Sequence, residues 1–179
     1  MFYVSKAMTA TPEEYKTPLQ KKVYNTLAEL KIYFERVDTD EAITMEDCVL
    51  INERLEMDMV KTLFLCNKKK TLFYLFITTD HKPFDTRRFC EALGISRVSF
   101  APRELFEDIL GTKIGAATVY SVLDDWDRTI QVVFDEEVTA MEYYGCSDGT
   151  TTGYMKVKTE DILHKILPYS KHKYKIVSI

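Results

Sequence analysis

Val60–Cys66 (VKTLFLC) and Thr71–Thr78 (TLFYLFIT) are two strongly apolar runs, separated only by the polar segment Asn67–Lys70 (NKKK). Aromatic and β-branched runs that flank a short polar segment are typical of two antiparallel strands joined by a turn. We therefore expect a β-hairpin with a charged turn in this part of the chain.

Helices and strands are expected on both sides of this hairpin. Leu19, Val23, Leu27 and Leu30 recur at helical spacing with polar residues between them, and Gly94 follows another helical segment at a typical helix end. Such patterns predict helices at 19–31, 44–56, 85–93, 102–110 and 159–167. Strands are expected at 32–37, 98–100, 130–134, 140–144, 154–157 and 174–177, a turn at 124–128, and loops at 145–153 and at 112–122, where the loop enters a strand.

This order of elements predicts a mixed α/β fold. Strands that alternate with helices favour a parallel sheet, whereas a hairpin adds antiparallel pairs, so a mixed sheet flanked by helices is expected. The 179 residues correspond to one domain. We expect residues 1–179 to form it, with residues 1–18 as a polar N-terminal lead-in.

The composition limits the function classes. The chain has 24 basic and 28 acidic residues and a net charge of −4, which argues against a protein that wraps nucleic acid without specificity. No run approaches the ~18 apolar residues of a membrane span, and Met1–Ala10 has no signal-like apolar core. We expect a cytoplasmic protein without a membrane or DNA partner.

The four cysteines are Cys48, Cys66, Cys90 and Cys146, and none belongs to a CxxC pair. Zinc ligands and a disulfide framework both require closer or more regular spacing, so neither is expected. Motifs for dinucleotides, nucleoside triphosphates, metalloproteases and serine hydrolases are also absent from the sequence. No metal or cofactor is predicted.

Lys61 is the first candidate for a working residue, because it stands at the entrance of an apolar strand. There its ammonium group could hold a phosphate or a carbonyl oxygen as a point charge. The alternative is a lysine whose charged end simply reaches water from a strand end.

Two further segments could contribute to a site. Gly115 and the following Ala116, Ala117, Thr118 and Val119 leave the backbone little covered, so their amides could approach an anion or an oxyanion. The alternative is a tight loop that needs small residues.

The second segment is 145–153, in which Ser147 and three threonines could bind polar substrate groups. A plain surface turn is the alternative. Tyr33 and Phe34, from the strand expected at 32–37, are weaker pocket candidates, since most aromatic residues of such a chain fill its core.

In order and spacing, segments along nearly the whole chain resemble the YbaK/aminoacyl-tRNA synthetase-associated domain superfamily, and within it the stand-alone prolyl-tRNA editing members that deacylate alanyl-tRNA for proline. The matching segments are 23–37, 38–44, 61–67, 82–86, 95–101, 115–123, 132–135, 144–146 and 158–163. The resemblance implies a compact fold around a curved, barrel-like mixed sheet.

The resemblance also implies a trans-editing deacylase, which hydrolyses the ester of a mischarged amino acid, alanine or another small residue, on tRNA(Pro). Lys61 would anchor the terminal nucleotide or the aminoacyl group, and the loop from Gly115 to Val119 would offer backbone amides to the scissile carbonyl. Catalysis would use a positioned water and the ribose hydroxyl, without a metal. The expected partner is the acceptor end of tRNA, with a synthetase as a further candidate.

The chain departs from the commonest family pattern at Thr39, Thr62, Val119 and Ser147, where His, Asn, Pro and His are frequent. A Thr hydroxyl at position 62 replaces an amide that both donates and accepts hydrogen bonds, and so reshapes a pocket. Either the substrate differs, or the chain is a non-catalytic binding module that senses an amino acid or an aminoacyl-tRNA end.

Basic residues gather in the hairpin turn, at Lys68, Lys69 and Lys70, and again after His164 near the C-terminus. A patch of this kind could bind the tRNA backbone. The alternative for both groups is a solvated turn and tail.

Overall fold

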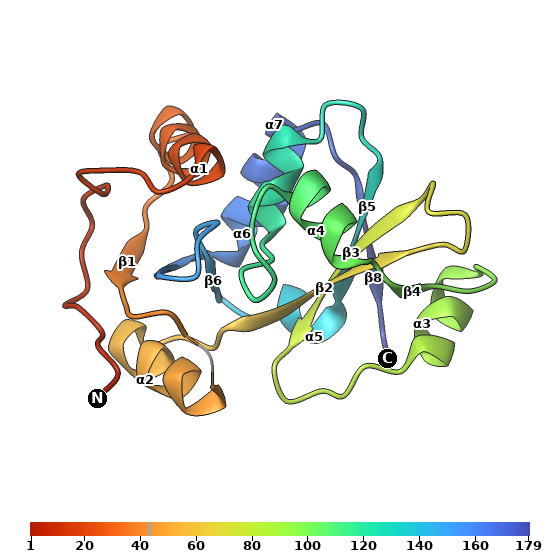
Figure 1. Ribbon diagram of the computed structural model, residues 1–179, viewed down its shortest axis with the longest axis horizontal. Coiled ribbons are helices and arrows are strands. Elements are labelled where there is room, and N and C mark those ends of the chain that lie inside the picture. The colour runs from red at the N-terminus through yellow and green to blue at the C-terminus, as the bar shows by residue number, and fades with distance from the viewer. Residues whose placement is uncertain (43) are drawn as a thin grey trace.

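The strands form two sheets, which lie side by side in Figure 1. This computed structural model describes residues 1–42 and 44–179. The larger sheet has five strands in the order β4 (Ser99–Phe100), β2 (Val60–Cys66), β3 (Phe73–Thr79), β5 (Ile130–Asp135) and β8 (Tyr174–Val177). The smaller sheet has the order β1 (Glu35–Asp38), β7 (Gly153–Lys158) and β6 (Tyr143–Ser147).

The predicted hairpin is confirmed at the centre of the larger sheet. β2 and β3 pair antiparallel from Val60 opposite Thr79 to Cys66 opposite Phe73. In the turn, the Asn67 side-chain oxygen accepts hydrogen bonds from the backbone N–H groups of Thr71 and Leu72, at 2.8 and 3.1 Å. β3 and β5, and then β5 and β8, pair in parallel. The sheet is therefore mixed, as expected, and the mixed α/β class is confirmed.

Helices cover both faces of the larger sheet. α3 (Thr86–Leu93) packs on one face, where Phe89 meets Tyr74 and Phe76 of β3. On the other face, alternate residues of β3 join the main core, together with the remaining helices. Those helices are α1 (Pro18–Glu29), α4 (Arg103–Leu110) and the C-terminal helical run, which consists of α6 (Thr159–Asp161), η2 (Ile162–Ile166) and α7 (Leu167–Tyr169).

α2 (Met45–Leu55) packs on the smaller sheet through the buried Ile51 and Leu55. Thr44 caps this helix in a reciprocal arrangement with Asp47, which places the helix start where the sequence predicted it. No helix among the described residues is both long and apolar enough to cross a membrane.

Three local predictions were wrong. Residues 112–122 lead into η1 (Val119–Asp124), a 3-10 helix, and no strand follows there. The strand expected at 140–144 begins later, as β6, because Ala140 still forms the end of α5 (Glu136–Thr139). β6 consequently extends into the segment 145–153 that was expected to be a loop. Neither sheet closes into a barrel among the described strands.

A buried carboxylate ties α1 to the turn between β6 and β7. Asp148 is fully buried and accepts hydrogen bonds from the Tyr24 hydroxyl at 2.8 Å and the Gln20 side-chain amide at 2.9 Å. Gly153 leaves the space for this carboxylate, since a Cβ at that position would lie 2.3 Å from an Asp148 oxygen. These buried hydrogen bonds therefore hold the smaller sheet against the N-terminal helix.

A second buried carboxylate, Asp125, joins the end of η1 to the start of β8. It accepts hydrogen bonds from the Ile130 and Thr129 backbones and lies 2.8 Å from the His172 Nε2 atom. Burial alone would raise the pKa of Asp125, but the hydrogen bonds from His172, Ile130 and Thr129 outweigh it and lower this pKa to about 2.

We predict that Asp125 makes the fold sensitive to acid. Its pKa is lower in the folded chain than in the unfolded one, so its stabilisation is complete above the ordinary value of 3.8 and is lost as pH falls toward about 2. This shift corresponds to about 2 kcal/mol of unfolding free energy. Urea unfolding of wild type and Asp125→Asn between pH 6 and pH 2 measures it, and the variant should lose stability less steeply over the acid range.

Asp124→Asn is the matched control, because Asp124 is an exposed neighbour that pairs with Lys22 at the surface. An Asp125→Asn variant with the same pH dependence as wild type would contradict the assignment.

Candidate active site

A cavity of about 440 Å³ lies where the two sheets meet. It collects residues from α2, the start of β2, the connection from β4 to α4, the loop before η1, and the ends of β6 and β7. Its described lining consists of Met45, Cys48, Met59, Val60, Lys61, Thr62, Leu63, Phe64, Asp80, Phe100, Ala101, Phe106, Ile114, Gly115, Ala117, Cys146, Ser147 and Tyr154.

The junction depends on a close approach at Gly145. Met59, just before β2, forms an isolated parallel bridge with Gly145 of β6. A Cβ on Gly145 would lie 2.6 Å from the Met57 sulfur and 2.9 Å from the Asp58 carbonyl oxygen. A side chain here would force the Met57 side chain and the backbone at Asp58 to shift, so the glycine permits the close approach of the two sheets.

Part of one cavity wall is an unpaired strand edge. The Ala101 N–H donates to the Phe64 carbonyl at 3.0 Å, so the backbone groups of Phe64 point away from β3. Because backbone direction alternates along a strand, those of Thr62 point to the same side. β4 pairs only with Leu65 and Cys66, so no described strand covers Thr62 on that side. A ligand in the cavity would find a free N–H and C=O there.

Lys61 lines the cavity at the start of β2 and is partly buried. Its ammonium group donates a hydrogen bond to the Lys82 carbonyl in the loop after β3. Among the described residues it forms no ion pair, so most of its hydrogen-bonding capacity remains available. The Lys82 carbonyl therefore fixes the position of the Lys61 ammonium group, but no described carboxylate neutralises its charge.

The loop that holds Lys61 is itself anchored. The Lys82 ammonium group donates to the buried Asp135 carboxylate at 2.8 Å, and Thr78 donates to the same oxygen at 2.8 Å. Burial alone would raise the pKa of Asp135, but the hydrogen bond from Lys82 leads the contacts that lower it. The Lys82–Asp135 pair therefore stays charged and fixes the carbonyl to which Lys61 binds.

The loop from Gly115 to Val119 contributes two lining residues, Gly115 and Ala117. Gly115 has φ +98°, a conformation that favours glycine. The Ala116 N–H is already used, since it donates to the Lys113 carbonyl at 3.0 Å. The N–H groups of Gly115 and Ala117 have no hydrogen-bond acceptor within residues 1–42 and 44–179. These two amides are the ones that the loop leaves free.

Ser147 also lines the cavity, but its hydroxyl is engaged in the turn between β6 and β7. It donates to the Thr150 carbonyl at 2.6 Å and accepts from the Gly149 N–H at 3.1 Å. Thr150 donates to Asp148, and Thr152 accepts from Lys16. The hydroxyls of this segment thus mainly stabilise the turn.

The other residues predicted for the site lie elsewhere. Ala116, Thr118 and Val119 are fully buried behind the loop, and Phe34 packs in the core against Tyr24. Tyr33 is 66% exposed, and Thr39 is buried beside the smaller sheet. None of these six lines the cavity.

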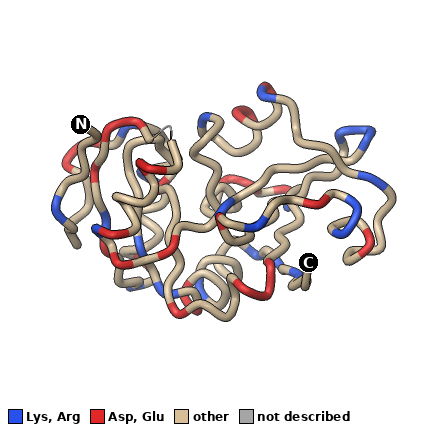
Figure 2. The backbone as a smooth tube through the Cα atoms, turned by 90° about the horizontal axis from the view of Figure 1, so that it is seen from below, with Lys and Arg blue, Asp and Glu red and all other residues tan. Residues whose placement is uncertain are grey.

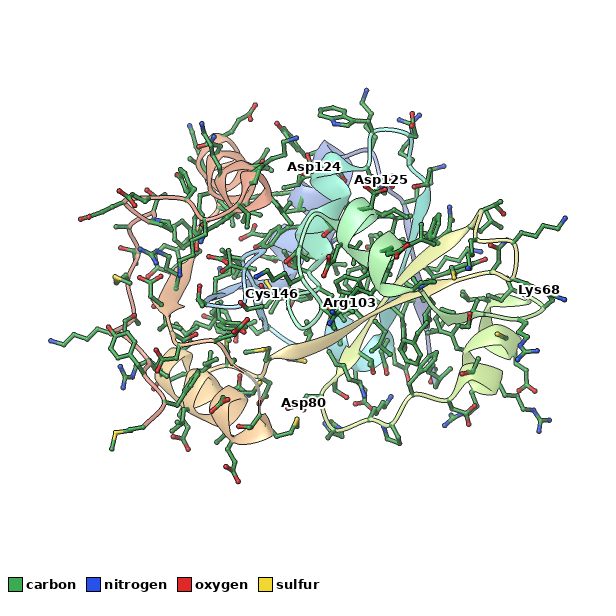
Figure 3. All side chains as sticks on the ribbon, in the orientation of Figure 1. Lys68, Asp80, Arg103, Asp124, Asp125 and Cys146 are labelled. Carbon is green, nitrogen blue, oxygen red and sulfur yellow. The ribbon has the colours of Figure 1, made fainter. Side chains whose placement is uncertain are left out.

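The hairpin turn follows the far end of β2, whereas Lys61 is at its start. The three lysines of this turn are exposed, and they are Lys68, Lys69 and Lys70. Seven residues of extended chain put Lys68 roughly 20 Å from Lys61. Figure 3 shows Lys68 far from Cys146 in the cavity wall, and in Figure 2 basic residues mark this end of the molecule.

Asp80, Cys48 and Tyr154 also line the cavity, although the sequence patterns did not predict them there. Asp80 could have been found from the hairpin register, because Lys61 pairs with Thr78 and Asp80 follows two residues later. Cys48 and Tyr154 come from α2 and β7, and no local pattern connects those elements to β2.

The described lining offers no nucleophile paired with a base. It contains no histidine, and burial raises the pKa of the Cys146 thiol to about 12. Burial, followed by the charges of Asp47 and Asp80, also raises the pKa of Cys48. An apolar cavity with free amides and one cation suits the binding and polarisation of a carbonyl compound.

Comparison with known proteins gives the family. Residues 39–165, more than half of the chain, match the model of the aminoacyl-tRNA editing domain. The chain therefore belongs to this family.

Two curated relatives cover most of the chain. A prolyl-tRNA editing protein ProX from Acetoanaerobium sticklandii is 24% identical over 160 residues, which cover 89% of this chain and 97% of that protein. A prolyl-tRNA synthetase associated domain-containing protein 1 from Danio rerio is 25% identical over 162 residues, which cover 89% of this chain and 87% of that protein.

Solved structures share the fold at lower identity. One, proposed to be a trans-editing enzyme for prolyl tRNA synthetase, has a TM-score of 0.62 and 14% identity and covers 92% of this chain and 99% of that one. A second structure, of a hypothetical protein, has a TM-score of 0.68 and 14% identity. It covers 88% of this chain and 99% of that one. These similarities establish the fold, and the family match agrees with it.

We predict that Gly145→Ala disturbs the sheet junction. The added Cβ would overlap Met57 and the backbone of Asp58, so the variant should be destabilised by about 1–3 kcal/mol in urea unfolding. The methyl resonance of Met57 should also shift.

Gly94→Ala is the control, since its Cβ would meet nothing within 4 Å and only its backbone conformation (φ +67°) costs about 1–2 kcal/mol. An unchanged Met57 resonance in Gly145→Ala would contradict this account of the junction.

Proposed function

We propose that this chain is a trans-editing aminoacyl-tRNA deacylase, which hydrolyses the ester of alanine or another small amino acid mischarged on tRNA(Pro). The observation that carries the proposal is the convergence of Lys61 with the free amides of Gly115 and Ala117 on one apolar cavity. The family match and the curated relatives support the same class of reaction.

In this mechanism a water molecule attacks the ester carbonyl carbon, and the carbonyl oxygen becomes an oxyanion. The N–H groups of Gly115 and Ala117 are the proposed donors to that oxyanion, and one such donor commonly contributes 10²–10³-fold to the rate. The C–O bond to the ribose then breaks, the ribose oxygen takes up a proton, and the amino acid leaves as a carboxylic acid. The neighbouring ribose hydroxyl orients the water in place of a protein base.

Lys61 anchors the substrate in this proposal. Its ammonium group can hold a phosphate or carbonyl oxygen of the terminal aminoacyl-adenosine, while the Lys82 carbonyl keeps the side chain in place. Thr62, beside it, offers a backbone edge as well as a hydroxyl to the bound group.

Size selects the amino acid in this proposal. The apolar wall excludes the larger cognate amino acid by shape. A second selection of this kind is needed because one or two methylene groups allow a synthetase only modest discrimination between amino acids. The residues at positions 62 and 147 differ from the frequent family pattern, so the preferred small amino acid is set by this chain's own lining.

The alternative function is a non-catalytic binding module that senses an amino acid or an aminoacyl-tRNA end. One observation favours it: the Ser147 hydroxyl is engaged within the turn and does not replace a titratable group at the cavity. A deacylation assay with Ala, Ser, Thr and Cys on tRNA(Pro) distinguishes the two functions. Release of none of them would favour the binding module.

The acceptor end of tRNA is the proposed partner, in the cytoplasm, with a synthetase as a further candidate. An acceptor strand that follows β2 from the cavity would reach Lys68, Lys69 and Lys70 at the hairpin turn. The separation between the cavity and these lysines is roughly 20 Å along β2.

We predict that Lys61→Ala lowers the deacylation rate of alanyl-tRNA(Pro) at least 100-fold, because the substrate loses its charged anchor. Lys61→Arg should retain part of the activity if a positive charge is the requirement. Single-turnover assays measure both, and circular dichroism checks that the variants fold.

Lys21→Ala is the control, because Lys21 is an exposed lysine of α1 away from the cavity. Equal rates for wild type and Lys61→Ala would remove Lys61 from the mechanism.

We predict that changing Lys68, Lys69 and Lys70 together to Glu raises the KM for mischarged tRNA about tenfold at low salt and weakens the dependence of KM on salt. The rate at saturating substrate should change little, since these residues lie at the far end of β2.

The same reversal at Lys165, Lys171 and Lys173 is the control, because it alters the net charge equally at the second basic region. If only this second variant raised KM, the tRNA contact would belong to the C-terminal region.

A further inference from the structure

We propose that Asp80 binds the α-ammonium group of the aminoacyl substrate, so that the site selects esters with a free α-amine. This inference rests on the proposed deacylase function and adds a specificity-determining residue to it.

Asp80 lines the same cavity as Lys61, at the end of the hairpin where β2 begins. β3 ends at Thr79, which pairs with Val60, and Asp80 follows directly. Its side chain lines the cavity and is 43% exposed. Figure 3 shows Asp80 below the start of β2, at the opposite end of the hairpin from Lys68.

The charges around the cavity are few and of opposite sign. Among the described lining residues Asp80 is the only acidic side chain and Lys61 the only basic one, and the others are apolar or uncharged. Lys61 is partly buried and the Asp80 side chain is 43% exposed, so both groups are accessible to a ligand of the opposite charge. The cavity therefore favours a ligand that carries both a cation and an anion.

The Asp80 carboxylate makes no close contact with a lysine or arginine among the described residues. The exposed His81 ring lies 3.7 Å from it, which is beyond hydrogen-bond distance. Lys61 donates instead to the Lys82 carbonyl. Within the described part of the chain, no group donates a hydrogen bond to the Asp80 carboxylate.

An aminoacyl-adenosine end has the matching charges. Its α-ammonium group is separated from the ester carbonyl by one carbon, and its phosphate is on the far side of the ribose. A carbonyl at the Gly115 and Ala117 amides places the ammonium group beside the reacting centre, where Asp80 is the available carboxylate. A charged hydrogen bond there would both orient the ester and reject a blocked amine.

The test compares alanyl-tRNA(Pro) with N-acetyl-alanyl-tRNA(Pro) as substrates of wild type and Asp80→Asn. Wild type should hydrolyse the free-amine substrate with a kcat/KM at least tenfold higher. Asp80→Asn should lower kcat/KM for the free amine about tenfold and leave the acetylated substrate nearly unchanged, so that the preference disappears.

Glu46→Gln is the matched control. Glu46 is an exposed carboxylate on α2 next to the lining residue Met45, but it does not line the cavity. This variant removes the same charge near the entrance and should keep the wild-type preference. A preference that persists in Asp80→Asn, or that is absent from wild type, would overturn the proposal.

Binding separates this inference from the proposed hydrolysis. The probe is 3′-amino-3′-deoxyadenosine that carries alanine in amide linkage, together with its N-acetyl derivative. In calorimetry, wild type should bind the free-amine probe about tenfold more tightly than Asp80→Asn does. If wild type hydrolyses neither tRNA but shows this difference, the deacylase proposal fails and the role of Asp80 stands. Equal binding by both proteins would reject Asp80.

Discussion

The contact between Gly145 and the segment before β2 is the constraint on which the rest of the structure depends. The two sheets meet at this bridge, and a glycine is required because a Cβ would overlap the Asp58 carbonyl and the Met57 sulfur. The close approach brings the start of β2 against the smaller sheet. Since β4 pairs only with the far end of β2, the near end keeps a free edge. The cavity is the space that this geometry leaves between the sheets.

The functional groups of the cavity are largely backbone groups. The N–H groups of Gly115 and Ala117 and the edge of β2 at Thr62 are held by the fold, so side-chain entropy is not lost when they bind a ligand. The charged side chains are restricted in a similar way, because Lys61 binds the Lys82 carbonyl and Lys82 binds the buried Asp135. An arrangement of this kind suits a reaction in which the substrate and a water molecule supply the reacting groups.

The departures from the frequent family pattern fall into two structural groups. Thr62 and Ser147 line the cavity and can alter which amino acid fits it. Val119 and Thr39 are buried away from it, and there they contribute to packing of η1 and to the edge of the smaller sheet. Asp80 belongs with the first group, and its charge gives the lining a polarity that an entirely neutral pocket would lack.

The sequence by itself determined the hairpin, the five predicted helical segments and the mixed α/β class, because periodicity, caps and turn residues act over a few neighbouring positions. It also identified Lys61, Gly115, Thr62, Ala117 and Ser147, which the structure brings to one cavity. It misplaced β6 and the segment before η1, where packing of Val138 and Val119 overrode local preference. Only the tertiary structure decided which amides are free, that Phe34 belongs to the core, and that Asp80 faces the same cavity as Lys61. Those properties depend on hydrogen bonds and contacts between residues far apart in the chain, which local sequence patterns do not encode.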